Sequence, residues 1–178
     1  MARFDAFLPI LLKYEGGFVN DPIDPGGATN KGVTLATFQK CATQYLGIDP
    51  TLENLKVLTD AQAGKIYKAL YWDKINGDDI ALQELANIVC DFHVNAGGYA
   101  AKLLQKVLND LGATPPLAVD EDIGAKTMAA LKTADQKAIY RRYKQGRIDY
   151  YRDLVAKRPA LGKFLKGWLN RIESFPDL

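Results

Sequence analysis

Two carboxylic acids nine residues apart are the side chains of this sequence best suited to acid–base chemistry. Glu15 ends an apolar stretch, whereas Asp24 lies in a segment rich in glycine and proline. A carboxyl group desolvated at the C-terminal end of a helix has a raised pKa, and one in a wetter loop stays ionised. Two carboxyl groups with separated pKa values are what glycoside hydrolysis requires. The alternative is that Glu15 only ends a helix and Asp24 only forms a turn before proline.

The remaining chemically active side chains exclude several other kinds of site. His93 is the single histidine, so an HExxH zinc site is absent, and no nucleophile-elbow motif accompanies it. Cys41, Cys90 and His93 are three possible metal ligands without a second CxxC pair, and the alternative is a histidine satisfied within the core. No glycine-rich phosphate-binding motif occurs. We therefore expect no metal and no cofactor.

The elements that must position the two acids are predicted to be mostly helical. Apolar residues recur at helical spacing from Phe4 to Leu11, and Glu15 continues the same stripe. Gly16 and Gly17 are expected to end this helix, and a small hairpin or loop to follow. Further helices are predicted over residues 35–45, from a capping box at 59–62, and over 82–93, 100–111, 124–131, 134–156 and 165–172. The predicted class is mainly α with one small β element after the first helix.

The composition is that of a globular protein, with 178 residues of which 48% are hydrophobic and 25% charged. No stretch approaches the roughly 20 apolar residues that cross a bilayer, so we expect no stable membrane insertion. The N-terminal apolar stretch, interrupted by Asp5, does not have the pattern of a Sec signal peptide. Two cysteines make no disulfide framework, and synthesis in the cytoplasm is expected.

Basic residues are concentrated in residues 132–171, which hold 12 lysines and arginines against three aspartates. Such an excess indicates an anionic partner, which is a nucleic acid, a membrane surface or an acidic polymer. The alternative is an ordinary solvated helix face.

Residues 15–34, with the sequence EGGFVNDPIDPGGATNKGVT, closely resemble the signature of the glycoside hydrolase 108 family. This family comprises bacterial and phage N-acetylmuramidases, some of which are called secretion activator proteins. The similarity continues through YWDKINGDDI, DFHVNAG and GWLNRI, and so extends over nearly the whole chain. It implies a lysozyme-like fold, with helices around a cleft and a hairpin that carries the second acid.

The family resemblance also implies a reaction, which is cleavage of the β-1,4 bond after N-acetylmuramic acid in peptidoglycan. A more distant similarity to phage lysozymes implies that Glu15 is the general acid, Asp24 the base or charge stabiliser, and Thr29 the residue that places water. Phage lysozymes have one more residue before the threonine, so Thr34 and Asn30 are alternatives to Thr29. A lytic transglycosylase would need Glu15 alone, and a non-catalytic wall-binding or secretion-assisting protein would need neither acid.

Four further residues are candidates for substrate binding. The aromatic side chains of Phe18, Tyr71 and Trp72 are suited to line sugar subsites, although the last two fit the core equally well at their helical spacing. Asn95 is a candidate to bind an N-acetyl group, and its alternative role is to cap a helix.

Residues 103–131 resemble a peptidoglycan-binding segment, with Glu121 where that motif has glycine. The alternative for this segment is a purely structural helix pair. We therefore expect a lysozyme-like catalytic part over residues 1–95 and a helical, peptidoglycan-binding-like part over 96–178, packed together as one compact unit. The expected partner is peptidoglycan, not nucleic acid, and the expected state is a monomer that acts on the cell wall in the periplasm or outside the cell.

Overall fold

The computed structural model describes residues 1–20 and 27–178. These residues form two compact units, an N-terminal unit of Phe4–Asp73 and a C-terminal unit that joins Met1–Arg3 to Lys74–Leu178. Helices dominate both units, and the one sheet in the described part of the chain is a two-stranded antiparallel pair. The predicted class, mainly α and lysozyme-like with one small β element after the first helix, is confirmed.

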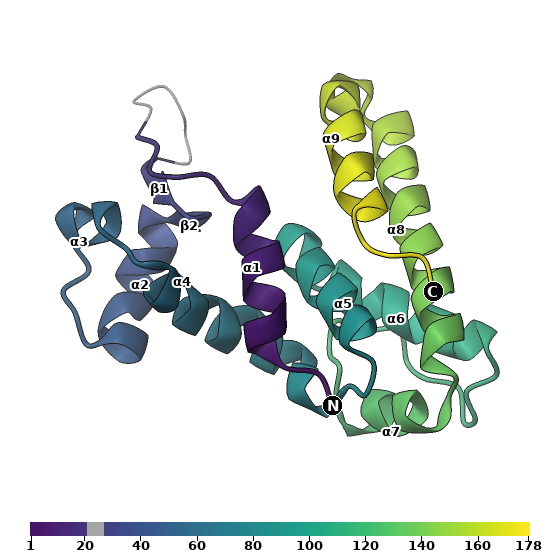
Figure 1. Cartoon of the computed structure of the whole chain (residues 1–178). Helices are drawn as coiled ribbons and strands as arrows, with labels where there is room; N and C mark the ends of the chain where they lie inside the picture. The colour runs from purple at the N-terminus through teal and green to yellow at the C-terminus, as the bar shows by residue number, and fades with distance from the viewer. Residues whose placement is uncertain (21–26) are drawn as a thin grey trace. The chain divides into compact units, whose positions relative to one another are not determined.

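The N-terminal unit contains four α-helices, one hairpin and one π-helical turn in the residues that the structure describes (Figure 1). In chain order they are α1 (Phe4–Tyr14), β1 (Thr29–Asn30), β2 (Val33–Thr34), α2 (Leu35–Leu46), α3 (Leu52–Lys56), α4 (Asp60–Tyr67) and the π-helical turn η1 (Lys68–Trp72). Helix α2 begins where the Thr34 hydroxyl accepts a hydrogen bond from the Thr37 amide and ends at Gly47, whose φ is 67°. Helix α4 opens with the predicted capping box of Thr59 and Gln62.

The core of the N-terminal unit is built where α1 meets α4 and η1. A Cβ placed on Gly64 would lie 2.7 Å from Leu8 Cδ2, so the Leu8 side chain of α1 packs directly on α4 at this glycine. The rings of Phe4 and Phe7 pack on Trp72, with centroids 5.6 and 5.8 Å away. These contacts hold the first half of α1, and Glu15 follows the opposite end of the helix.

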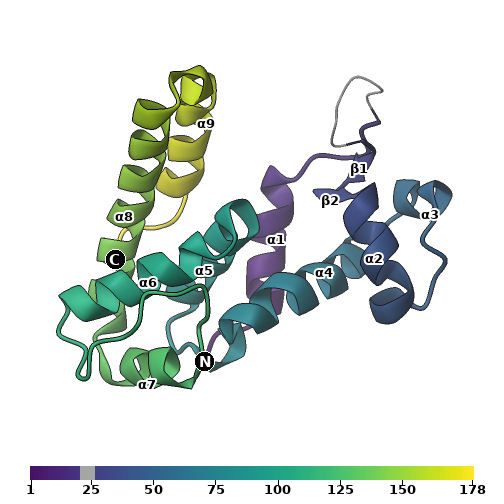
Figure 2. The ribbon, with the colours of Figure 1, turned by 180° about the vertical axis from the view of Figure 1, so that it is seen from behind.

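The C-terminal unit is a helical assembly. It begins with the 3₁₀ turns η2 (Asp73–Ile75) and η3 (Gly77–Asp79) and continues with α5 (Gln83–Ala96), α6 (Tyr99–Asp110), α7 (Ala125–Thr133), α8 (Gln136–Lys157), the 3₁₀ turn η4 (Pro159–Leu161) and α9 (Gly162–Glu173). Helices α8 and α9 run side by side, and α8 also packs on α5 and α6 (Figures 1 and 2). The helix predictions for this half of the chain are confirmed, with ends that differ by one to three residues.

Helices α6 and α8 are joined by a polar contact inside the core. The fully buried Tyr143 hydroxyl donates a hydrogen bond to the Ala100 carbonyl at 3.1 Å, and burial raises the pKa of this tyrosine. One turn along α8, a Cβ on Gly146 would lie 2.6 Å from Leu103 Cδ1, so the two helices come together closely there.

The boundary between the two compact units falls after Asp73, because α5 packs with α6 and α8. The functional division at residue 95 and the packing of both parts as one unit stay predictions. None of the helices in the described residues combines the length and the apolar character needed to cross a membrane.

Candidate active site

The first candidate acid lies directly after the last residue of α1. The Glu15 backbone amide still donates to the Leu12 carbonyl at 3.2 Å, and its side chain is half-buried. Gly16 and Gly17 follow, so the helix ends and the chain turns back toward the hairpin. The structure thus places the Glu15 carboxyl group at the end of the apolar helix, as predicted.

A short hairpin lies over the segment that follows Glu15. Thr29 pairs with Thr34, and Thr29 also exchanges two backbone hydrogen bonds of 2.8 Å with Val19. Lys31 and Gly32 form the turn, with φ values of 50° and 74°, as in a two-residue turn that matches the twist of the strands. The hairpin that the sequence predicted as one of two possibilities is therefore present.

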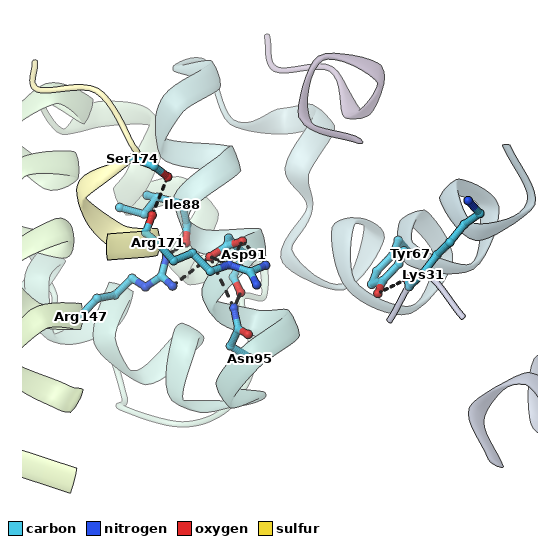
Figure 3. A network of polar contacts seen from close by, with 8 residues as sticks. All are labelled: Lys31, Tyr67, Ile88, Asp91, Asn95, Arg147, Arg171 and Ser174. Carbon is cyan, nitrogen blue, oxygen red and sulfur yellow. Dashed lines mark hydrogen bonds and ion pairs between the residues drawn. The ribbon is translucent and has the colours of Figure 1, made fainter. Parts of the chain in front are cut away.

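The hairpin turn is fixed to both ends of α4. The Tyr67 hydroxyl donates to the Lys31 carbonyl at 3.0 Å (Figure 3). Lys31 Nζ also forms an ion pair with Asp60 at 2.6 Å. The Lys31 amide in turn donates to the Gly16 carbonyl at 3.0 Å. The turn thus ties the chain beside Glu15 to helix α4.

Gly32 marks the point where the candidate acid and a tyrosine converge. A Cβ placed on Gly32 would lie 2.8 Å from Glu15 Cδ and would collide with both Glu15 Oε2 and the Tyr67 hydroxyl oxygen. Both oxygens therefore lie over the same Cα, in a space that any other residue would fill. Tyr67 is buried, and its position in an apolar helical stripe indicated only a core residue in the sequence.

Of the three candidates for the third active-site residue, two have structural roles. Asn30 is buried, and its amide donates to the Leu55 and Lys56 carbonyls at 2.9 and 3.0 Å. The Thr34 hydroxyl caps α2. Thr29 lies on β1 and is half-buried.

The three aromatic candidates lie in different environments of the N-terminal unit. Phe18 is 37% exposed, and Lys56 Nζ lies 5.7 Å from its ring centroid. Tyr71 is half-buried in η1, with its ring centroid 5.7 Å from that of Tyr67. Trp72 has no exposed surface and stacks on Phe7, so the structure supports the core alternative for it and not a sugar-lining role.

The second candidate acid, Asp24, lies outside the described residues. Asn95 belongs to the last turn of α5 in the C-terminal unit and is exposed. Its amide donates to the Asp91 carbonyl oxygen at 2.7 Å, and Gly97, not Asn95, caps the helix. The alternative of a helix cap for Asn95 is therefore wrong in detail, although the side chain does bond to the last turn of its own helix.

A buried ion network lies beneath Asn95 and was not predicted. Asp91 receives Arg147 Nη2 at 2.9 Å and Arg171 Nη2 at 2.8 Å, so one carboxylate joins α5, α8 and α9 (Figure 3). The Arg147 guanidinium lies over the Phe92 ring at 4.9 Å. Asp91 belongs to the DFHVNAG motif and Arg171 to the GWLNRI motif. The ion network therefore joins two motifs that lie far apart in the sequence.

Among the described residues, no group of three or more His, Cys, Asp or Glu side chains is placed to hold a metal ion. His93 is half-buried in α5, where its Nδ1 lies 3.0 Å from the Gly97 carbonyl oxygen, and burial lowers its pKa. Both cysteines are buried.

Comparisons with known proteins agree with this architecture. The chain matches the family profile described as Glycosyl hydrolase 108 over residues 8–97 and the profile described as Predicted Peptidoglycan domain over residues 99–173. No curated protein matches the sequence. Among solved structures, SagA of Brucella abortus is 32% identical, with a TM-score of 0.74 over 97% of this chain and 90% of that one. The protein belongs to the glycosyl hydrolase 108 family and carries a C-terminal peptidoglycan-binding domain.

Proposed function

We propose that the protein is a peptidoglycan hydrolase that cleaves the β-1,4 bond between N-acetylmuramic acid and N-acetylglucosamine. The observation that carries this proposal is the convergence of Glu15 and Tyr67 over Gly32. A general acid must be held in a fixed orientation toward the leaving oxygen, and this packing restricts the carboxyl group. Membership of a glycosyl hydrolase family supports the same reaction class.

In the proposed mechanism, Glu15 protonates the glycosidic oxygen as the bond breaks. Asp24 activates a water molecule on the opposite face of the sugar ring, and the product inverts. This assignment requires a separation of about 6.5–9.5 Å between the two carboxyl groups in the substrate complex. Thr29 is our choice to orient that water, because the side chains of Thr34 and Asn30 are committed to the fold.

The substrate side of the site is proposed to use the exposed ring of Phe18 and the half-buried ring of Tyr71. Aromatic faces bury the apolar face of a sugar while the hydroxyl groups stay hydrated. Asn95 remains our candidate for the N-acetyl group. The protein would act as a monomer on the wall in the periplasm or outside the cell, in the manner of an endolysin or a secretion activator.

The direct test compares Glu15→Gln with a matched control, Glu53→Gln, on purified peptidoglycan. Glu53 is an exposed glutamate in the first turn of α3 of the same unit. We expect Glu15→Gln to lose about 10²–10⁴-fold in the rate of fragment release and Glu53→Gln to keep the wild-type rate. If the wild type binds the wall but releases nothing, the protein is a non-catalytic wall-binding protein and the proposal is wrong.

A further inference from the structure

A groove of about 880 Å³ lies in the C-terminal unit between the end of α6, the loop after it, and α7. Its lining is mostly small and apolar, and includes Leu108, Leu111, Pro116, Ala118, Ala129 and Ala130. A second cavity of about 210 Å³ adjoins it, since Leu117, Ala118 and Lys126 line both. Asp120 and Asp122 line this smaller cavity. Neither cavity has a role in the proposed reaction.

Side-chain hydrogen bonds hold the wall of the groove in place. Asn109 donates to the Leu117 carbonyl at 2.9 Å and accepts from the Leu117 amide at 2.7 Å. A ligand that enters this groove therefore does not have to order the loop at Leu117.

The wall of the smaller cavity is held in the same way by the buried Gln105. Its amide donates to Asp120 Oδ1 at 2.7 Å and to the Asp122 carbonyl at 2.8 Å. The Gln105 bond to Asp120, with that from the Asp122 amide, holds the pKa of the Asp120 carboxyl group below its usual value. The motif residues that resemble a peptidoglycan-binding segment thus build a pre-formed wall with a fixed negative charge.

Peptidoglycan consists of glycan strands and peptide stems, and the chemistry of the lining distinguishes between these two components. Among the described residues that line the two cavities, none is aromatic. Sugar-binding sites commonly stack a pyranose ring on an aromatic face, so this lining is poorly suited to the glycan strand. It offers instead an apolar trough for small side chains, one lysine at the junction, and two aspartates beyond it.

We propose that this groove binds the peptide stems of peptidoglycan and not its glycan strand. Peptide stems carry alanine methyl groups that fit an alanine-lined trough, a carboxylate that pairs with Lys126, and, where a diamino acid is present, an ammonium group that pairs with Asp122. The inference rests on the proposed function for its partner and on the peptidoglycan-domain profile that covers the groove. The peptide stems are then the component of peptidoglycan that the C-terminal domain recognises, and the groove is the surface that binds them.

The test uses the full chain as the Glu15→Gln variant, so that binding is measured without cleavage. Purified peptidoglycan is compared before and after an amidase has removed its peptide stems. We expect the apparent Kd to rise at least about tenfold on the stripped glycan, and Lys126→Glu to weaken binding to the intact material by a similar factor. The control Lys132→Glu, on the same helix but outside the groove, should bind as the parent does.

A soluble stem tetrapeptide, titrated into the same variant, should shift the amide resonances of Ala118, Lys126 and Ala129. Equal binding to intact and stripped material, or tetrapeptide shifts confined to other residues, would overturn the inference. Its failure is distinct from failure of the proposed function: a wild-type protein that cleaves peptidoglycan but binds it without regard to stems refutes only the groove assignment. Stem-dependent binding by a wild-type protein that cleaves nothing refutes only the reaction.

Discussion

The carboxyl group of Glu15 and the hydroxyl group of Tyr67 meet over the Cα of Gly32. These residues come from the end of α1, the end of α4 and the turn of the hairpin, so three elements converge at one carboxylate. The Tyr67 hydroxyl donates a hydrogen bond to the Lys31 carbonyl at 3.0 Å, which holds the tyrosine against the hairpin turn. The packing limits the orientation of the Glu15 carboxyl group, as its proposed role of general acid requires.

Replacing Gly32 by alanine should damage both the fold and the activity. The new methyl group would collide with Glu15 and Tyr67, and alanine is strained at a φ of 74°. We expect a loss of about 1–3 kcal/mol of unfolding free energy in urea, together with a lower rate of peptidoglycan cleavage. Gly17→Ala is the control, because a Cβ there meets nothing within 4 Å, and it should stay within about 0.5 kcal/mol of the wild type. Equal stability of the two variants would show that the convergence over Gly32 is not restrictive.

The variant Tyr67→Phe keeps the ring and removes the hydroxyl group. The Lys31 carbonyl loses its donor, which should cost about 1 kcal/mol of stability. The carboxyl group of Glu15 loses a neighbour that limits its orientation, so the rate of peptidoglycan cleavage should also fall. Tyr45→Phe on α2 is the control. A cleavage rate equal to that of the control would mean that Tyr67 acts on stability alone.

Asp91 should be a major source of stability in the C-terminal unit. Its replacement by asparagine leaves the buried Arg147 without a charged partner, and breaking a buried pair from one side costs about 3–5 kcal/mol. Asp149→Asn removes an exposed carboxylate that only accepts a bond from Gln145, and should change stability by less than about 0.5 kcal/mol. Urea denaturation of both variants measures the difference. A cost below about 1 kcal/mol for Asp91→Asn would contradict the role of the network.

Some basic residues of α8 stabilise the fold, and others are exposed and could contact an anionic polymer. Lys144 donates to the Phe175 carbonyl at 2.6 Å and pairs with Asp177 at 2.7 Å, so Lys144→Glu should mainly destabilise the fold. Lys137 and Arg141 are exposed, although Arg141 Nη1 also donates to the Leu178 carbonyl at 3.0 Å. Reversing both charges should lower activity on whole walls more than on short soluble fragments. Wall binding should also weaken as rising salt shortens the Debye length below about 8 Å. Equal losses on both substrates would assign these residues to an ordinary solvated face.

Local rules predicted the elements well. Helix α2 begins after Thr34 and ends at Gly47, and such caps depend only on residues within one helical turn. The capping box at Thr59 was predicted for the same reason. The five-residue helix α3 and the π-helical turn η1 were not predicted, since neither is long enough to show a helical period.

Contacts between distant segments could not be predicted in this way. Tyr67 lies in an apolar stripe, and its polar partner is 36 residues away on the hairpin. Asp91 and Arg171 are 80 residues apart, and the family motifs that contain them showed no sign that they form an ion pair. Glu15 was predicted as a site residue because its place at the end of a helix is visible in the local sequence, whereas the residues that pack around it are not.

The products released from purified peptidoglycan test the central claim most directly. Mass spectrometry identifies the sugar at the new end, and NMR in the first minutes, before mutarotation, identifies its anomer. The account predicts fragments that end in a reducing N-acetylmuramic acid, formed as the α-anomer, with Glu15→Gln slower by about 10²–10⁴-fold. Anhydro ends would show that the protein is a transglycosylase, a β-anomer would refute the water-activating role of Asp24, and wild-type rates from Glu15→Gln would contradict the assignment of the general acid.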